Sequence, residues 1–218
     1  QVKAEATPPV APPAFNKAQL STDAPASPWV VANKRRPLNP KTYVPTVAAP
    51  AMKLRLSAST PEMHVSTQAL ADLQRLDAAA KAAGHQLMLA SGYRSYNTQV
   101  AVYGNEVRAY GQAQADRQSA RPGHSEHQTG LAIDLAPASG ACMIQECFGD
   151  MPEGQWLAAN AHQYGFIIRY PQGKEPVTGY LYEPWHVRYV GTALAAELRR
   201  LGNPTMEEFF GLPAAPNY

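Results

Sequence analysis

The 218 residues include 19 Lys and Arg against 17 Asp and Glu, so the net charge is only +2. A general nucleic-acid-binding protein would carry a basic stripe, and this charge balance argues against one. With 45% apolar and 17% charged residues, the composition excludes a chain that is disordered throughout. No apolar run approaches the ~20 residues that span a bilayer, and the length suits one domain with a tail.

The N-terminal segment differs in composition from the rest. Ten of the 20 prolines lie in the first 50 residues, and all 15 glycines lie at or after Gly84. Residues 1–28 are rich in Ala, Pro, Ser and Thr without a helical or strand period, which predicts a flexible, polyproline-like tether. A cleaved propeptide or an expression leftover is the alternative. We expect residues 29–218 to form the domain, with 29–47 as ordered coil packed onto it.

The first elements in the chain are predicted from hydrophobic periodicity. Residues 66–83 form a helix that begins at an N-cap of Ser66 or Thr67. Residues 85–94 form a buried strand. Residues 96–110 form a second helix, in which Tyr and Val recur at steps of three and four, and we expect this stripe to pack into the core.

The second half of the chain adds shorter strands and two helices. Residues 131–136 form a buried strand and 153–165 a helix. The strands 166–171 and 183–190 can pair with each other, and 191–202 forms a closing helix. This order predicts an α+β fold, with a small, mainly antiparallel sheet and flanking helices.

Two cysteines, Cys142 and Cys147, lie close together in ACMIQECFGD. They are too few to build a structural zinc site alone. A short loop closed by a disulfide is typical of exported proteins and is the favoured interpretation. Two thiols in a reducing compartment are the alternative. The chain begins with Gln, and we expect that an upstream piece such as a signal peptide was removed.

Chemically active side chains concentrate in SEHQTGLAID and EPWH. His127 and Asp134 flank a glycine, and Glu183 and His186 are three residues apart. Two His and one Asp are a ligand set of catalytic metal sites, and Glu183 would be the base. Residues three apart on a strand point to opposite faces, so a twist, bulge or strand start must bring Glu183 to the metal. The alternative is a hydrogen-bonded core pair beside a surface carboxylate.

A third polar stretch, SGYRSYNTQ, follows the strand predicted at 85–94. Arg94 can reach into a cleft and bind a carboxylate through two parallel N–H bonds, and Gln99 can add an amide contact. A surface Arg at a strand end is the alternative. No Ser lies in a nucleophile-elbow pattern, and HExxH is absent from the sequence.

These motifs resemble the VanY-type D-alanyl-D-alanine carboxypeptidases, within a zinc peptidase group that includes lysostaphin-type enzymes and the hedgehog domain. The matching stretches are SGYRS, SEHQTGLAID and NAHQYGFIIRYPQGKEPVTGYLYEPWHVRYVG. The resemblance implies that the metal is Zn²⁺, that its ligands are His127, Asp134 and His186, and that Glu183 is the general base.

The same resemblance implies that Arg94 binds the substrate and stabilises the developing oxyanion, and that Gln99 and Ser125 contact the substrate. The implied activity is release of the terminal D-alanine from peptidoglycan stem peptides by a D,D-carboxypeptidase. An L,D-carboxypeptidase acting on tetrapeptide stems, an endopeptidase, and a zinc-containing binding module are the alternatives. We expect an exported monomer, active in the cell envelope or secreted, with membrane or wall tethering through its N-terminal segment.

Overall fold

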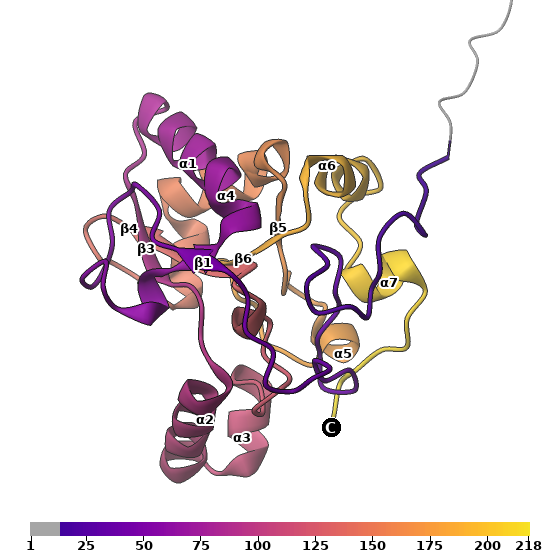
Figure 1. The fold of residues 1–218 in the computed structure, drawn as a ribbon. Helices are drawn as coiled ribbons and strands as arrows, with labels where there is room; N and C mark the ends of the chain where they lie inside the picture. The colour runs from indigo at the N-terminus through magenta and orange to yellow at the C-terminus, as the bar shows by residue number, and fades with distance from the viewer. Residues whose placement is uncertain (1–13) are drawn as a thin grey trace, which may run out of the picture.

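A four-stranded antiparallel sheet forms the centre of the structure (Figure 1). The computed structural model describes residues 14–218, and residues 1–13 of the predicted tether lie outside the described residues. The strands lie in the order β3-β4-β6-β5 and comprise Leu87–Ser91 (β3), Ala132–Pro137 (β4), His186–Tyr189 (β6) and Phe166–Ile168 (β5). This arrangement confirms the predicted fold class and the pairing of the last two strands.

The side chains of the inner strand β4 alternate between two chemically different faces of the sheet. Ile133 and Leu135 belong to the main apolar core, together with Val187 of β6. Because neighbouring side chains on a strand point to opposite faces, Asp134 lies on the other face. Asp134 is directly opposite His186 in the β4–β6 register, so two predicted metal ligands share that face.

Helices cover the apolar face of the sheet. α1 (Thr67–Ala82) and α4 (Pro152–Asn160) pack against it (Figure 1), and α6 (Thr192–Arg200) lies beside β5. The side chain of Ser66 accepts a hydrogen bond from the backbone N–H of Gln68, which confirms the predicted N-cap. α4 continues as a short 3-10 turn that ends at Gly165, where φ is 82°.

The helix predicted at 96–110 forms, but its apolar stripe does not enter the core. α2 (Tyr96–Tyr110) pairs with α3 (Gln112–Gln118), and Figure 1 shows both apart from α1, α4 and α6. The buried residue of α2 is Gln99, whereas Val100 is 48% and Tyr110 62% exposed. The prediction of core packing was therefore wrong, because this helix pairs with a short helix rather than with the sheet.

The N-terminal segment packs against the end of the chain in a second apolar cluster. Trp29 and Val31 are buried against residues of α6 and of α7 (Met206–Phe210), as expected for 29–47. Residues 14–28, which the sequence assigned to the tether, also lie on the domain. Phe15 packs on Trp29 and Phe209, with ring centroids 5.5 and 5.7 Å apart. The contact is favourable because three aromatic side chains leave water together.

The remaining elements are short. They comprise β1 (Val47–Ala48), β2 (Val65–Ser66), α5 (Glu175–Thr178) and 3-10 turns at Pro61–Met63, Glu126–Thr129, Glu146–Asp150 and Ala161–Tyr164. β1 and β2 form a separate two-stranded ribbon. Among residues 14–218, no helix combines the length and the apolar character needed to cross a bilayer.

Four charged side chains, one of them Arg188 of β6, form a fully buried network. Arg169 donates to Glu126 at 2.9 Å and makes two bonds to Glu207, at 2.9 and 2.7 Å. Arg188 donates to Glu126 at 2.8 Å. Burial by itself raises the pKa of Glu207, but the paired Arg169 outweighs burial and holds that pKa below its usual range.

We predict that Glu207→Gln lowers the free energy of unfolding by on the order of 3 kcal/mol at pH 7, because it leaves Arg169 partly uncompensated in the interior. Urea titration measures the change. The neighbouring Glu208→Gln is the control: Glu208 pairs with the half-exposed Lys174, and we expect a loss below ~1 kcal/mol.

The stability loss expected for Glu207→Gln depends on pH. Because the pKa of Glu207 is lowered in the folded state, its stabilising effect is present above the ordinary Glu pKa of ~4.3 and is lost as pH falls through the folded value. The difference between wild type and Glu207→Gln should therefore shrink below about pH 4. A constant difference from pH 7 to pH 3 would contradict the assigned ion pair.

Candidate metal centre

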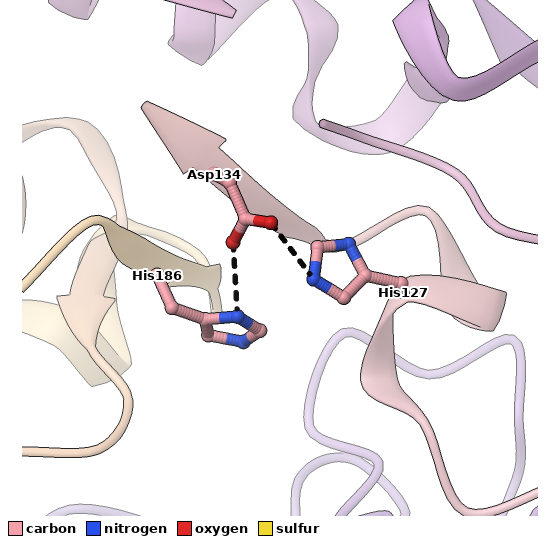
Figure 2. Close-up of side chains that lie close together, drawn as sticks. All are labelled: His127, Asp134 and His186. Carbon is pink, nitrogen blue, oxygen red and sulfur yellow. Dashed lines mark ion pairs between the residues drawn. The ribbon is translucent and has the colours of Figure 1, made fainter. Parts of the chain in front are cut away.

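His127, Asp134 and His186 form a buried cluster on the polar face of the sheet. Their ligand atoms all lie within 4.8 Å of one another. Figure 2 shows Asp134 between the two imidazoles, with one carboxylate oxygen facing each ring. The separations are 3.4 Å from Asp134 Oδ2 to His127 Nε2 and 3.2 Å from Asp134 Oδ1 to His186 Nδ1. Three side chains from two strands and a turn thus converge on one point.

Glycines set the backbone that positions His127. Gly130 ends the 3-10 turn Glu126–Thr129 at φ 69°, a left-handed conformation that glycine adopts readily, and leads into β4. Gly92 follows β3, where a Cβ atom would lie 2.2 Å from the carbonyl oxygen of His64. The Gly92 carbonyl in turn lies 2.8 Å from His127 Nδ1. A larger residue at Gly92 would therefore displace the group that orients this imidazole.

Glu183 reaches the cluster because β6 starts at His186. The backbone N–H of His186 bonds to the carbonyl of Glu183 across a turn, and Glu183 Oε2 lies 3.6 Å from His186 Nδ1. Of the three arrangements considered from the sequence, a strand start is the one that occurs. Burial raises the pKa of Glu183 to about 8, an effect that His186 partly offsets. A cation bound alongside would favour the ionised carboxylate.

The donor set fits a metal ion. Proton donation from His127 Nδ1 to the Gly92 carbonyl leaves Nε2 directed at Asp134 with its lone pair. Asp134 Oδ1 is buried and has no hydrogen-bond partner among residues 14–218. Burial alone would lower the pKa of His186, but the nearby carboxylates of Asp134 and Glu126 raise it to about 9. Two imidazoles and a carboxylate are typical zinc ligands.

A cleft of about 620 Å³ opens onto the cluster. Arg94 and Ser125, which the sequence predicts to contact a substrate, both line it. Arg94 donates to Gln99 Oε1 at 3.0 Å and to Ser91 Oγ at 3.2 Å, which directs its guanidinium. Gln99 is fully buried, and its amide also donates to the carbonyl of Ala120 at 2.6 Å. Gln99 therefore holds Arg94 from behind. The sequence predicted that Gln99 contacts the substrate, but its side chain does not line the cleft.

Two walls border this cleft away from the sheet. The α2–α3 hairpin contributes Tyr110, and the loop between Cys142 and Cys147 contributes Ile144 and Glu146. A disulfide joins the two cysteines, whose Cα atoms are 5.6 Å apart. Of the stripe that the sequence suggested for the core, Tyr110 thus lines the cleft instead.

Two neighbours of the cluster, Tyr170 and Glu126, were not apparent from the sequence. Tyr170 packs on the His186 ring with centroids 4.9 Å apart. Glu126, between the predicted residues Ser125 and His127, points into the interior toward His186. The burial of Glu126 is apparent only in the structure, because its neighbours in the sequence are polar.

The comparisons with known proteins agree with this geometry. A sequence model of the VanY family, described as D-alanyl-D-alanine carboxypeptidase, matches residues 62–192. The chain belongs to the VanY D-alanyl-D-alanine carboxypeptidase family. This is a family of peptidases, and the predicted family and enzyme class are confirmed.

Relatives differ in length and in named activity. The chain is 40% identical over 181 residues to the putative carboxypeptidase YodJ of Bacillus subtilis. The matched region covers 83% of this chain and 66% of that protein. It spans 38% to 56% of the length of three enterococcal relatives named for D-Ala-D-Ala carboxypeptidase activity.

Solved structures share the fold over most of the chain. The LdcB LD-carboxypeptidase matches with a TM-score of 0.80 and 39% identity, over 86% of this chain and 87% of that one. The vancomycin-resistance D,D-pentapeptidase VanY, solved with Zn(II), matches with a TM-score of 0.70 and 30% identity, over 84% and 98%. Zinc is thus seen in a member of the family with the same fold.

We predict that purified wild-type protein binds about one zinc ion per chain and that His186→Ala binds far less, because two remaining ligands hold the ion poorly. Elemental analysis after dialysis measures the ratio. His85→Ala is the control, since the His85 ring lies against Trp156 and is not part of the cluster. Full zinc occupancy in His186→Ala would remove that residue from the site.

Proposed function

We propose that this protein is a zinc-dependent carboxypeptidase that releases the terminal D-alanine from peptidoglycan stem peptides. The observation that carries the proposal is one cleft in which a buried His–Asp–His cluster, a buried carboxylate and a directed arginine converge. A zinc ion held by His127, Asp134 and His186 would supply Lewis-acid chemistry at the scissile carbonyl.

Glu183 is the general base of the proposed reaction. Its carboxylate lies 3.6 Å from His186 and faces the cleft, where it can accept a proton from the attacking water. The same group then donates that proton to the amine that leaves as the C–N bond breaks. Burial raises the pKa of Glu183, and a bound cation would favour the ionised carboxylate that accepts the proton.

Arg94 supplies positive charge in the same cleft. Its bonds to Gln99 and Ser91 fix the plane of the guanidinium before a substrate arrives. Fixed donors stabilise a developing oxyanion more than mobile ones, because they need no reorganisation during the reaction. A planar arginine also binds a terminal carboxylate with two parallel bonds.

Two bonds in a stem peptide are candidates for cleavage. The D,D bond of a pentapeptide is supported by the family description and by the names of the enterococcal relatives. The L,D bond of a tetrapeptide is supported by structural relatives named L,D-carboxypeptidases, which are 39% identical to the chain, against 30% for the D,D-pentapeptidase. Both reactions release D-alanine and need the same machinery.

We further propose that the enzyme acts outside the cytoplasmic membrane. Stem peptides of the mature wall lie there, and the disulfide between Cys142 and Cys147 is stable in such an oxidising compartment.

Replacing the base separates binding from turnover. We predict that Glu183→Gln keeps the fold and the zinc but loses about 10²–10⁴-fold in kcat, the usual contribution of a general base. Glu146→Gln is the control, because Glu146 lines the same cleft from the exposed disulfide loop, and we expect a small change. Activity of Glu183→Gln close to that of wild type would show that another group activates the water.

Defined peptides distinguish the candidate reactions. We predict that the zinc-loaded enzyme releases D-alanine from a pentapeptide stem, a tetrapeptide stem or both, and that amidation of the terminal carboxylate removes most of this activity. Mass spectrometry identifies the bond that is cut. Equal rates on acid and amide would indicate an endopeptidase, and zinc binding without any hydrolysis would indicate a binding module.

A further inference from the structure

Glu126 is a buried carboxylate that the proposed hydrolysis does not use. Its side chain has no exposed surface. One of its oxygens, Oε1, accepts from Arg169 Nε at 2.9 Å and from a terminal nitrogen of Arg188 at 2.8 Å. These bonds fix the carboxylate in place. The other oxygen, Oε2, is buried and has no hydrogen-bond partner among residues 14–218.

The atom that Glu126 Oε2 faces is Nε2 of His186, at 3.9 Å. That nitrogen is also buried and also lacks a hydrogen-bond partner in the described part of the chain. The other ring nitrogen, Nδ1, faces Asp134 and Glu183, at 3.2 and 3.6 Å. An imidazole that offers the lone pair of Nδ1 to a cation carries its proton on Nε2, and this proton points at Glu126.

We propose that Glu126 is a positioning residue for the metal ligand His186: its carboxylate holds the proton on Nε2 and keeps Nδ1 directed at the metal. The inference rests on the metal centre of the proposed function. The 3.9 Å separation is longer than the about 2.9 Å of a good N–H···O bond, so the proposal requires the imidazole to move toward Glu126 when the metal is bound. A carboxylate in this place also makes the imidazole a stronger ligand.

The two imidazoles of the cluster are thus supported differently. His127 Nδ1 lies 2.8 Å from a neutral acceptor, the Gly92 carbonyl. His186 faces a charged acceptor that two arginines hold rigidly. Since hydrogen bonds to charged groups are roughly twice as strong as neutral ones, the orientation of His186 should depend on its partner more than that of His127.

Glu207 provides a matched control for this role. It belongs to the same buried network and makes two bonds to Arg169, but its described contacts do not include His186. Glu126→Gln and Glu207→Gln each remove one negative charge from that network and keep the side-chain shape. Of the two, only Glu126→Gln would place an amide group against the Nε2–H of His186.

The test compares the zinc dissociation constants of wild type and both variants by competition with a chromophoric chelator, at a temperature where circular dichroism shows all three zinc-free proteins folded. Glu126→Gln should bind zinc about 10–100-fold more weakly than wild type, the usual effect of losing such a partner. Glu207→Gln should stay within a few-fold of wild type. Equal affinities of the two variants would overturn the proposal.

A second measurement uses wild-type protein, so it does not depend on either variant folding. Long-range ¹H–¹⁵N spectra of the zinc-loaded protein report which ring nitrogen carries the proton. We expect it on Nε2 of His186 and on Nδ1 of His127, and a proton on Nδ1 of His186 would overturn the proposal. Failure of the proposed function would look different: wild-type protein would bind no zinc or would leave stem peptides intact.

Discussion

The register between β4 and β6 is the constraint on which the site depends. It places Asp134 directly opposite His186 and fixes both on the face away from α1 and α4. A slip of one residue would move every side chain of the strand to the other face. Ile133 and Leu135, which alternate with Asp134, resist that slip because they would leave the apolar core. Core packing and the metal cluster therefore form together, which couples metal binding to folding.

The buried network of Arg169, Arg188, Glu126 and Glu207 also orients the site. Arg188 bonds to the backbone carbonyls of Pro28 and Val30, while Arg169 bonds to Glu207 of α7. Arg188 thus attaches the N-terminal segment to the strand that carries His186, and α7 is connected to the same network through Arg169 and Glu126. Buried ion networks are a weak source of stability, because desolvation offsets their attraction. Their value here is orientation, since a charge held by fixed partners can hold a ligand in turn.

The reacting groups and the walls of the cleft are built on different kinds of structure. Asp134 and His186 lie on paired strands, where positions are set to within fractions of an ångström. The walls come from the α2–α3 hairpin and from the loop that a disulfide closes, both largely outside the main core. Relatives with one fold are named for D,D- and for L,D-activity. A rigid reaction centre with separate walls is consistent with both activities.

Much of the site was readable from local sequence. Short motifs pointed to His127, Glu183 and Arg94 as site residues. Hydrophobic periodicity predicted α1 and the central strands, because capping and burial patterns act over a few residues. Other features depended on partners far along the chain. Gln99 holds Arg94 from behind, and Tyr110 of the α2 stripe lines the cleft, because the position of that helix is decided by what it packs against. Glu126 gained a role only when folding placed it beside His186, 60 residues away in the chain.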